Sequence, residues 1–349
     1  IYADEKFRNQ ESVWRGLKLL IQQGGIDGNI ALEIVPASLE TLVETLDNLA
    51  LGLIQDLPAL VIIDLPFDNS PRSLEILERI ARFSEKLLVP SISWITPRFL
   101  YLDTWQELTK LPFLPHYLEE SAFAKWRRLR AMSSANWLVV TCNRFLIRYP
   151  YGRDNKPRLA PFEERRNLWI SPVWAIACLL AKSFDRHGWP TRFTEWQHIR
   201  LEDLALHPVD TTKVLPTEAA FSDDRIQQFI RGGLMPLIAQ QGKSIAFSPA
   251  ESTLAGGSLS YQMLTSRISQ FLIWCSDNIE KNLEPVELQE TLYQAFSLFW
   301  EKSGHPRPED LQISAGRSNS DNRIRLHIAL KPSRQILPGG EKVEMEFFW

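Results

Sequence analysis

The sequence predicts a mixed α/β fold, in which helices pack on mixed β-sheets. Three features of the 349-residue chain point to it. Strand-like apolar runs alternate with amphipathic helical stretches between residues 30 and 94, and residues from 311 onward show the period-2 alternation of antiparallel strands. The composition, 44% hydrophobic and 23% charged, is that of a globular protein with a real core.

The N-terminal part is predicted as a helix followed by strand–helix alternations. An amphipathic helix is expected over 7–21, because its apolar residues recur at helical spacing and Gly24 and Gly25 follow it. Strands are expected at 30–35, 58–64 and 87–94. The run 58–64 is continuously apolar, which is typical of a strand covered on both faces. Helices are expected between these strands, over 38–54 and from Ser70 and Pro71 onward.

The remainder of the chain mixes helices and strands. Helices are expected over 121–132, 172–184, 223–231, 259–283 and 285–302. Strands are expected over 136–147, 189–196, 311–317, 323–330 and 342–349, with a hairpin formed by 234–239 and 243–248. The length allows one large or two ordinary domains. We therefore divide the chain into an N-terminal α/β domain, 1–135, and a C-terminal α+β domain, 136–349, that can interleave with the first.

Charge and cysteine usage exclude several classes of protein. There are 39 Lys and Arg residues against 42 Asp and Glu, and a net charge of -3 provides no field that would attract nucleic acid. The odd cysteine number and the apolar surroundings indicate reduced core residues of a cytoplasmic protein; these are Cys142, Cys178 and Cys275. The apolar stretch 172–184 is shorter than the ~20 residues of a bilayer span, so no membrane insertion is expected.

Catalytic and cofactor motifs are weak. Gly242-Lys243-Ser244 matches only the end of a phosphate-binding loop, and a strand is expected after it where such a loop opens a helix. Glu195 and His198 have the spacing of a helical metal pair, but no second pair accompanies them. The sequence contains no G-x-S-x-G motif. We expect no catalytic residue, no cofactor and no metal, and hence no enzyme.

A basic run, KWRRLR at 125–130, has two interpretations. It is either a docking face for an acidic partner or a helix whose basic side faces solvent while Trp126 and Leu129 turn inward. The second interpretation is favoured, because a helical repeat of apolar residues usually marks a core-facing side.

A second motif, RYPYGRDNKP at 148–157, follows a predicted strand. Pro150 restricts the backbone, Gly152 is expected to take a positive φ, and Asp154 and Asn155 favour turns, so the motif predicts a rigid corner. Its arginines, Arg148 and Arg153, are then free to reach a carboxylate or backbone carbonyls. The corner has no nucleophile and suits a protein contact.

Several ordered blocks resemble the large subunit of the contractile sheath of type VI secretion systems. They are the W-R-G-L core of the first helix, SAFAKWRRLR, RYPYG, FEERRNLWISPVWAIACLLAKSF and LPTEAAFSDDRIQQFIRGGLMPLIAQQGKSIAFSPAES. The family normally has a further N-terminal portion, including a strand-exchanging arm, before the W-R-G-L helix; none is present in this sequence, which opens on Ile1. Where relatives have G-D-[YF]-x-F, this chain has IIDLPFD. The chain is thus expected to be processed, shortened or part of a longer protein.

The resemblance implies a structural protein with a sheath-like fold and terminal strands suited to adding to a neighbour's sheet. It implies that the subunit polymerises into a helical tube with a small sheath subunit around an inner tube protein, attaches to a baseplate, contracts, and is dismantled by an AAA+ ATPase. The residues expected to have structural or interface roles are Trp14, Arg15, Gly16, Trp126, Arg127, Arg148, Pro150, Tyr151, Gly152, Trp169, Pro172, Pro216 and Glu218. Two alternatives stay open: a shortened scaffold, cap or baseplate adaptor with the same fold, and a soluble α/β enzyme.

Overall fold

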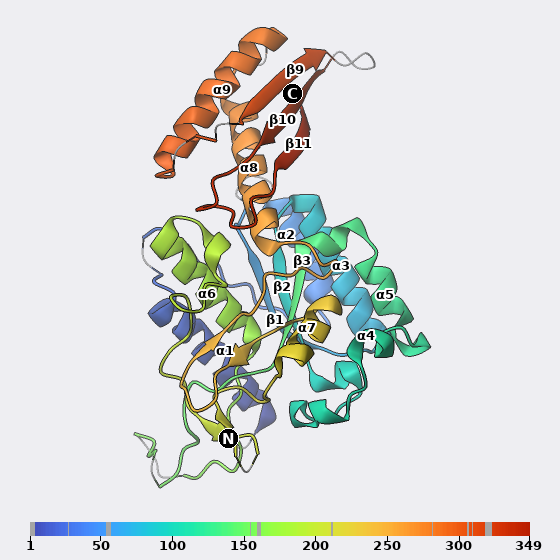
Figure 1. Ribbon diagram of the computed structural model, residues 1–349, viewed down its shortest axis with the longest axis vertical. Helices are drawn as coiled ribbons and strands as arrows, with labels where there is room; N and C mark the ends of the chain where they lie inside the picture. The colour runs from blue at the N-terminus through green and yellow to red at the C-terminus, as the bar shows by residue number, and fades with distance from the viewer. Residues whose placement is uncertain are drawn as a thin grey trace.

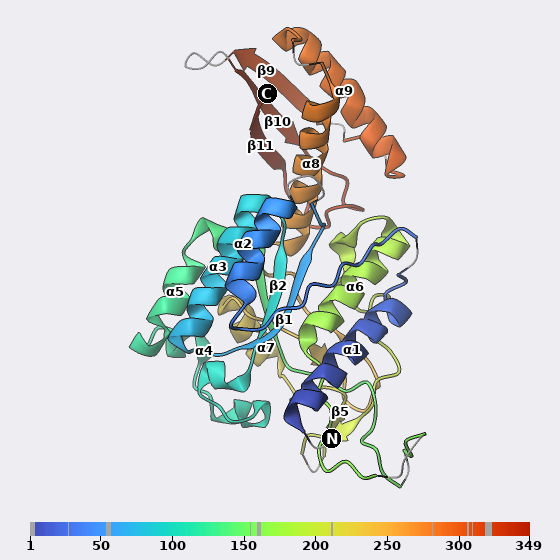
Figure 2. The same ribbon diagram turned by 180° about the vertical axis from the view of Figure 1, so that it is seen from behind.

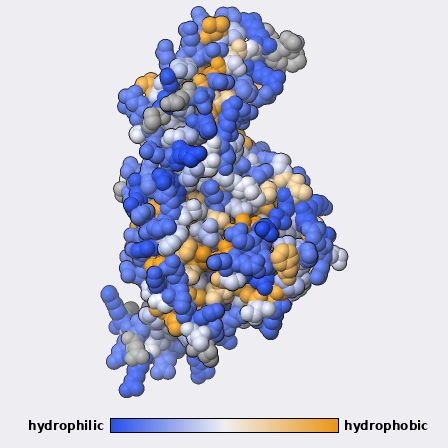
Figure 3. Space-filling model, in the orientation of Figure 1, coloured by the Kyte–Doolittle hydropathy of each residue, from blue (hydrophilic) through white to orange (hydrophobic). Residues whose placement is uncertain are grey.

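A computed structural model describes residues 4–26, 28–53, 57–153, 155–158, 162–210, 212–280, 282–305, 307–308, 310–317 and 323–349. It has a large body and a smaller C-terminal lobe, which the helix α8 (Leu259–Asn278) connects (Figure 1). The space-filling view shows the narrowing between the two (Figure 3). Within the described ranges, no helix combines the length and the apolar character that a bilayer crossing requires. The predicted mixed class of helices and sheets is confirmed.

A parallel sheet forms the centre of the body. Its strands are β1 (Val61–Phe67), β2 (Ser91–Ile95), β3 (Leu138–Cys142) and β6 (Met235–Pro236), in the order β1-β2-β3-β6. The inner strands β2 and β3 are buried at every residue, whereas the edge strand β1 is only partly buried. The expectation that 58–64 contributes a strand covered on both faces is confirmed, because Ile63 packs in the buried cluster on one side of the sheet and Ile62 against the cluster on the other. The strand is only partly buried because it lies at the edge of the sheet.

Helices cover both faces of this sheet. One face carries α2 (Leu42–Gly52), α3 (Pro71–Leu87) and α5 (Ala124–Arg130), and the other carries α1 (Glu5–Gln23) and α6 (Pro172–His187) (Figures 1 and 2). A separate cluster of buried residues lies behind each face. The smaller helices α4 (Leu114–Tyr117) and α7 (Asp223–Arg231) close the body at the β6 side.

Short elements complete the body. The predicted hairpin is confirmed as β7 (Ile238–Ala239) paired with β8 (Ala246–Phe247), and β4 (His207–Pro208) pairs with β5 (Val214–Leu215). Single turns of 3-10 helix lie at Pro97–Leu100, Trp105–Lys110, Ser121–Phe123, Ser133–Trp137 and Pro190–Arg192.

The helix ends follow the local sequence signals. The side chain of Ser70 caps α3 by accepting the backbone N–H of Ser73, with Pro71 in the first turn. Pro172 likewise opens α6, and Gly188 closes it with a φ of 72°. Both boundaries agree with the predictions from the sequence.

The lobe consists of α8, α9 (Pro285–Lys302) and an antiparallel sheet of β9 (Gln312–Arg317), β10 (Ile324–Leu330) and β11 (Val343–Phe348), in the order β11-β10-β9. One face of this sheet is buried against the helices and the other is exposed to solvent, as predicted. The body reaches into the lobe through Trp189, which belongs to the lobe's buried cluster, and through Thr191, whose hydroxyl donates to the carbonyl of Ile336.

Two predicted strands are absent. Residues 30–35 lie outside any strand and their apolar side chains are mostly exposed; none of the described strands pairs with them. Residues 189–196 form no strand: Pro190–Arg192 is a 3-10 turn and irregular turns follow it, since Pro190 lacks the N–H that a ladder needs. The boundary at 135 stays a prediction; β1 and β2 lie before it and β3 and β6 after it, in one sheet.

Candidate functional site

The strongest polar cluster of the body is the corner predicted at 148–157. The Arg148 guanidinium donates to both carboxylate oxygens of Glu164, at 2.9 Å from Nη2 to Oε1, and also to Glu11 at 3.1 Å. Only 11% of the Arg148 side chain and 2% of the Glu164 side chain are exposed. A bidentate pair so shielded from water fixes the positions of both side chains. We call the residues Arg8, Glu11, Arg15, Arg148, Tyr151 and Glu164 the ion-pair corner.

The corner fastens α1 to the loop after β3. Arg8 of α1 donates to Glu164 at 3.1 Å and to the backbone carbonyl of Asn167 at 2.7 Å. Arg15, two turns further along, donates to Glu11 at 2.6 Å and to the Tyr151 hydroxyl at 2.9 Å. These side chains of α1 lie on one helix face, so this single helix contributes both positive and negative charges to the network.

Tyr151 contributes its ring and its backbone. The Arg148 guanidinium carbon lies 4.0 Å from the centre of the Tyr151 ring, and the Tyr151 N–H donates to Glu164 at 2.7 Å. Burial by itself would raise the pKa of Glu164, but the hydrogen bonds from Arg148 and Tyr151 and the charges of Arg148 and Arg8 outweigh it and lower that pKa. Burial opposes the charge of Arg148 too, and its carboxylate partners hold the pKa of Arg148 above its usual value. Glu164 and Arg148 therefore remain ionised at neutral pH.

The expectation that Arg148 reaches a carboxylate or backbone carbonyls is confirmed, since it donates to Glu164, to Glu11 and to the carbonyl of Tyr149. The expectation for Gly152 is wrong. Gly152 does not have a positive φ, and a side chain added there would meet open space. Asn155 makes the turn instead, by donating to the carbonyl of Tyr149 at 2.7 Å. Asp154 lies outside the described residues.

A pocket of about 420 Å³ opens beside the corner. Its lining residues are Tyr149, Pro150, Tyr151, Gly152, Arg153, Asn155, Glu163 and Glu164. Tyr149 and Arg153 are exposed at this surface. The pocket has a mixed polar and apolar lining and borders a structural ion pair, which fits a contact surface better than a catalytic cleft.

The helix α5 confirms the inward-facing interpretation of the basic run. Trp126 and Leu129 are buried, and the Trp126 indole donates to the carbonyl of Gly232. Arg127 donates to the carbonyls of Leu118 and Glu120 at 2.8 and 2.7 Å. The remaining charges pair with α3 or reach backbone carbonyls, through Lys125–Glu75, Arg128–Glu78 and Arg130 to Leu254 and Arg231. These cations are therefore engaged within the body, where they link α5 to α3 and to neighbouring backbone.

Gly16 allows α1 to approach α6 closely. A Cβ at Gly16 would lie 2.3 Å from Cδ1 of Trp174, so only glycine fits. On its other side Trp174 donates its indole N–H to Asp64 of β1 at 2.6 Å, and Trp94 of β2 donates to the same carboxylate at 3.1 Å. Burial raises the pKa of Asp64. The Trp174 ring is thus clamped between the first helix and the sheet.

The other predicted residues lie at separate places. Trp14 on α1 is 63% exposed, and Pro172 is buried at the start of α6. Trp169 packs edge-on against His207, and its carbonyl accepts from Ser12. Pro216 is buried, and its carbonyl accepts the backbone N–H of Leu146. Glu218 forms a bidentate pair with Arg144, 2.9 Å for each bond.

The structure therefore brings Arg15, Arg148, Pro150, Tyr151 and Gly152 together, and leaves the other predicted residues elsewhere. The sequence interpretation missed the other members of the ion-pair corner, Arg8, Glu11 and Glu164. It also missed Asp64, which accepts from Trp174 and Trp94. The i, i+4 pair Glu11–Arg15 was the one local signal available. Glu164 lies 16 residues after Arg148 and gave no such signal.

The motifs considered for chemistry lie in structural settings. Gly242 and Lys243 form the turn between β7 and β8, as the predicted hairpin required. Glu195 pairs with Arg192, and His187 Nε2 lies 3.7 Å from its carboxylate. Burial raises the pKa of Cys178 to about 12 and that of Cys275 to about 11, so these thiols are not ionised at neutral pH. Among the described residues no group of three His, Cys, Asp or Glu side chains is placed to hold a metal ion.

Comparison with known proteins identifies the family. The family model described as VipB: EvpB/VC_A0108, tail sheath N-terminal domain, matches residues 58–254, which is more than half of the chain. The chain belongs to this tail sheath family. The match runs from just before β1 to beyond β8, and so includes the whole central sheet of this sheath-family protein. The resemblance to type VI sheath subunits is confirmed.

One curated relative of this sheath-family protein is the type VI secretion system sheath protein TssC1 of Pseudomonas aeruginosa. It is 27% identical over 272 residues, which cover 69% of this chain and 55% of that protein. The chain thus spans about half the length of this relative. Two solved structures are also similar: the sheath tail protein Lin1278 from Listeria innocua (TM-score 0.43, 8% identity, 91% of this chain and 61% of that one) and the contracted helical sheath of the anti-feeding prophage (TM-score 0.45, 9% identity, 90% and 72%).

Proposed function

We propose that the protein is a structural subunit of a contractile type VI secretion sheath. In this role it polymerises with a small sheath subunit into a helical tube around an inner tube protein, and the tube shortens to expel its content. The observation that supports the proposal most is the family match over 58–254, because it covers the central sheet and the residues that hold α6 and α7 on it.

The work of such a subunit is mechanical. It needs a body that moves as a unit while its contacts with neighbours change, since the energy of contraction lies in the difference between two packings of the same subunits. The ion-pair corner, and the packing of Trp174 between Gly16 and Asp64, would supply that stiffness. Together they hold α1 against α6, the loop after β3 and the central sheet.

The proposal includes the remaining partners. The outer edges of β9 and β11 could each accept a strand from a neighbour through backbone hydrogen bonds. A baseplate, an inner tube and an AAA+ ATPase that dismantles the contracted form are proposed as further partners in a cytoplasmic assembly. We propose neither nucleic acid nor a metal or cofactor as a ligand, and no catalysis by this chain.

The test is co-production of the chain with the product of a small-sheath-subunit gene. Electron microscopy is expected to show tubes in an extended and a contracted form. Tubes of one length only would favour the alternative role as a scaffold or adaptor. A chain that remains monomeric beside its companion would contradict the proposal.

The enzyme alternative has a separate test. Calorimetry with ATP and GTP is expected to show no binding, and Lys243→Ala is expected to leave assembly unchanged, because Lys243 lies in a hairpin turn. Nucleotide binding that Lys243→Ala abolishes would restore that alternative.

A further inference from the structure

The charges of this chain are distributed unevenly along its sequence. Residues 19–71 contain eight acidic residues and no lysine or arginine. Residues 148–166 contain six lysines and arginines against three acidic residues. A net charge of -3 for the whole chain hides this separation. Such asymmetry within one folded protein steers association between complementary surfaces.

The acidic segment includes an uncovered surface. Glu33, Glu44 and Asp47 are exposed, and within the described residues none of them forms an ion pair. Two apolar side chains lie in the same segment, Leu32 and Ile34, with 41% and 61% exposed. Together these five residues are called the acidic face. Glu44 and Asp47 are three residues apart on α2 and therefore point to the same side of the helix.

Residues next to the acidic face limit its extent. Glu40 lies between the two parts of the face, and Arg72 interacts with it. The adjacent helix α3 exposes both signs of charge, since Arg82 pairs with Glu78 there. The excess of negative charge is thus confined to the segment that leads into α2 and to α2 itself.

The basic surface lies on the chain around the ion-pair corner. It consists of Arg153, Lys156, Arg158, Arg165 and Arg166, all of them exposed, and we call it the basic rim. No ion pair of these five side chains occurs in the part of the chain that the structure describes. The corner uses Arg148 and Glu164 internally, so their charges cancel and the rim retains the positive excess.

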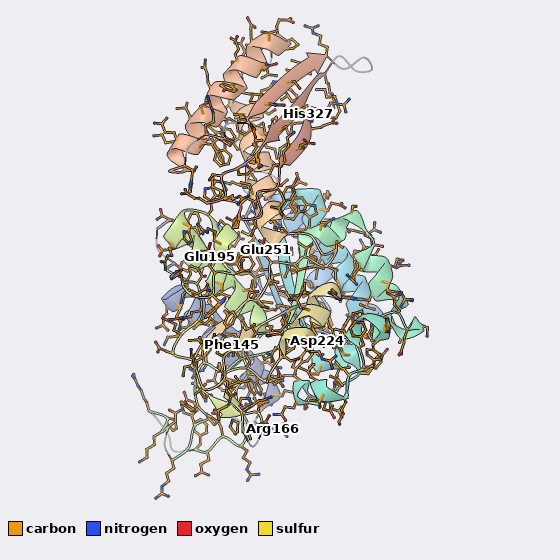
Figure 4. The ribbon with its side chains drawn as sticks, viewed as in Figure 1. Phe145, Arg166, Glu195, Asp224, Glu251 and His327 are labelled. Carbon is orange, nitrogen blue, oxygen red and sulfur yellow. The ribbon has the colours of Figure 1, made fainter. Side chains whose placement is uncertain are left out.

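The acidic face and the basic rim lie on different parts of the body. Segment 30–41 crosses the back of the body and leads into α2, near the end where α8 leaves (Figure 2). Arg166 lies at the opposite, lower end (Figure 4), where the space-filling view shows a hydrophilic projection (Figure 3). One molecule cannot bring these surfaces together. Two molecules can, and each then retains one unused surface.

We propose that the acidic face of one copy docks on the basic rim of a second copy. The inference deepens the proposed function, since it rests on self-assembly and names the surfaces that carry it. A contact between two different surfaces of identical chains is heterologous, so it propagates into an open helical row unless it closes on itself. The partner is another copy because this chain itself supplies both signs of charge on surfaces that do not overlap.

The test uses charge reversal on each surface. The rim variant carries Arg153→Glu, Arg158→Glu and Arg165→Glu, and the face variant carries Glu33→Lys, Glu44→Lys and Asp47→Lys. All six positions are exposed, so circular dichroism and the melting temperature are expected to match the wild type. Self-association of the full chain is measured by analytical ultracentrifugation at low and at high salt.

The rim variant and the face variant, each tested alone, are expected to self-associate roughly tenfold more weakly than the wild type. High salt is expected to weaken the self-association of the wild type. An equimolar mixture of the two variants still offers one intact rim and one intact face, so it is expected to form discrete pairs that do not grow. A chain carrying all six changes has both surfaces inverted and is expected to associate again. This rescue distinguishes charge pairing from general damage.

The outcomes separate the inference from the proposed function. If the wild type assembles and both variants assemble equally well, the charge pairing is wrong while the sheath function stands. If only the rim variant loses assembly, and only when the small sheath subunit is present, the rim binds that subunit and the self-docking inference is overturned. A wild type that stays monomeric at low salt, alone and with the small subunit, contradicts both.

Discussion

At Glu164 a carboxylate with 2% of its side chain exposed accepts hydrogen bonds from Arg148, from Arg8 and from the backbone of Tyr151. Removing one charge from such a cluster leaves the others shielded from water and without compensation, which costs more than the pair itself contributes. Glu164 is therefore the residue on which the ion-pair corner depends most.

Glu164→Gln is expected to lower the free energy of unfolding by about 2 kcal/mol. The amide keeps an acceptor for Tyr151 but loses the charge that holds Arg148 and Arg8. Urea unfolding followed by tryptophan fluorescence measures the change. The matched control is Glu163→Gln, next in sequence and exposed, which should stay within about 0.5 kcal/mol of the wild type. Equal losses in both variants would show that the corner does not stabilise the body.

The same residue predicts a pH dependence. The pKa of Glu164 is lowered from its ordinary value of 4.5, so the folded protein binds this proton more weakly than the unfolded chain does. The contribution of Glu164 is therefore fully present above pH 4.5 and is lost as the pH falls through the lowered pKa. The stability difference between wild type and Glu164→Gln should shrink over that range. A constant difference down to pH 3 would contradict this assignment.

At this scale the sequence identified the arginine and the tyrosine of the corner but not its carboxylates. Arg148, Pro150 and Tyr151 stand in one recognisable motif. Glu11 and Glu164 approach them only after α1 and the chain before α6 have packed. Partners that depend on such long-range packing leave no local pattern in the sequence.

Among the elements, α1 and α6 make the closest helix contact that the site depends on. Gly16 brings the α1 backbone against Trp174, and Asp64 fixes the far side of the same ring. Overpacking this contact would displace α1 and, with it, both Arg8 and Arg15 of the ion-pair corner.

Gly16→Ala is expected to destabilise the protein by about 1–3 kcal/mol, although alanine favours helices, because the added Cβ overlaps the Trp174 ring. Thermal unfolding measures the loss. Gly152→Ala serves as the control and should cost nothing, since that position has open space and no positive φ. A Gly16→Ala variant that is more stable than the wild type would mean that the α1 backbone does not contact the Trp174 ring in solution.

Elements with strong local signals were predictable, and those that depend on a neighbour were not. The helix α3 begins at the Ser70 and Pro71 that the sequence shows, α6 begins at Pro172 and ends at Gly188, and α7 ends at Gly232. The end of α3 at Leu88, which has a φ of 54°, had no such signal. Segment 30–35 has the composition of a strand, yet a strand needs an edge to pair with, and composition does not say whether one lies nearby. In segment 189–196 the strand-like alternation of the sequence reflects Trp189 and Thr191, whose side chains contact the lobe.

As a whole, the molecule has separate buried clusters: one behind each face of the central sheet and a third in the lobe. The lobe cluster contains Phe296 and Trp300 of α9, both fully buried. It contacts the body mainly through the chain around Trp189 and through the first turns of α8. Local stability is therefore expected to differ between the body and the lobe.

Phe296→Ala is expected to cost about 3–5 kcal/mol, because a large buried side chain leaves a cavity. Hydrogen exchange with mass spectrometry should show lost protection in residues 259–349 and little change in β2 and β3. Leu298→Ala, on the same helix and 58% exposed, is the matched control and should leave exchange unchanged. Uniform loss of protection in both parts would mean that body and lobe unfold together.

Because α8 starts among the buried side chains of the body and ends among those of the lobe, it acts as a stiff lever about 30 Å long. A force or torque applied to the C-terminal sheet is then transmitted to the body through this rigid helix. The lobe therefore cannot rotate independently of the body. A rotation of the lobe must also move the first turns of α8 and change the packing of Leu259 and Met263 in the buried cluster of the body.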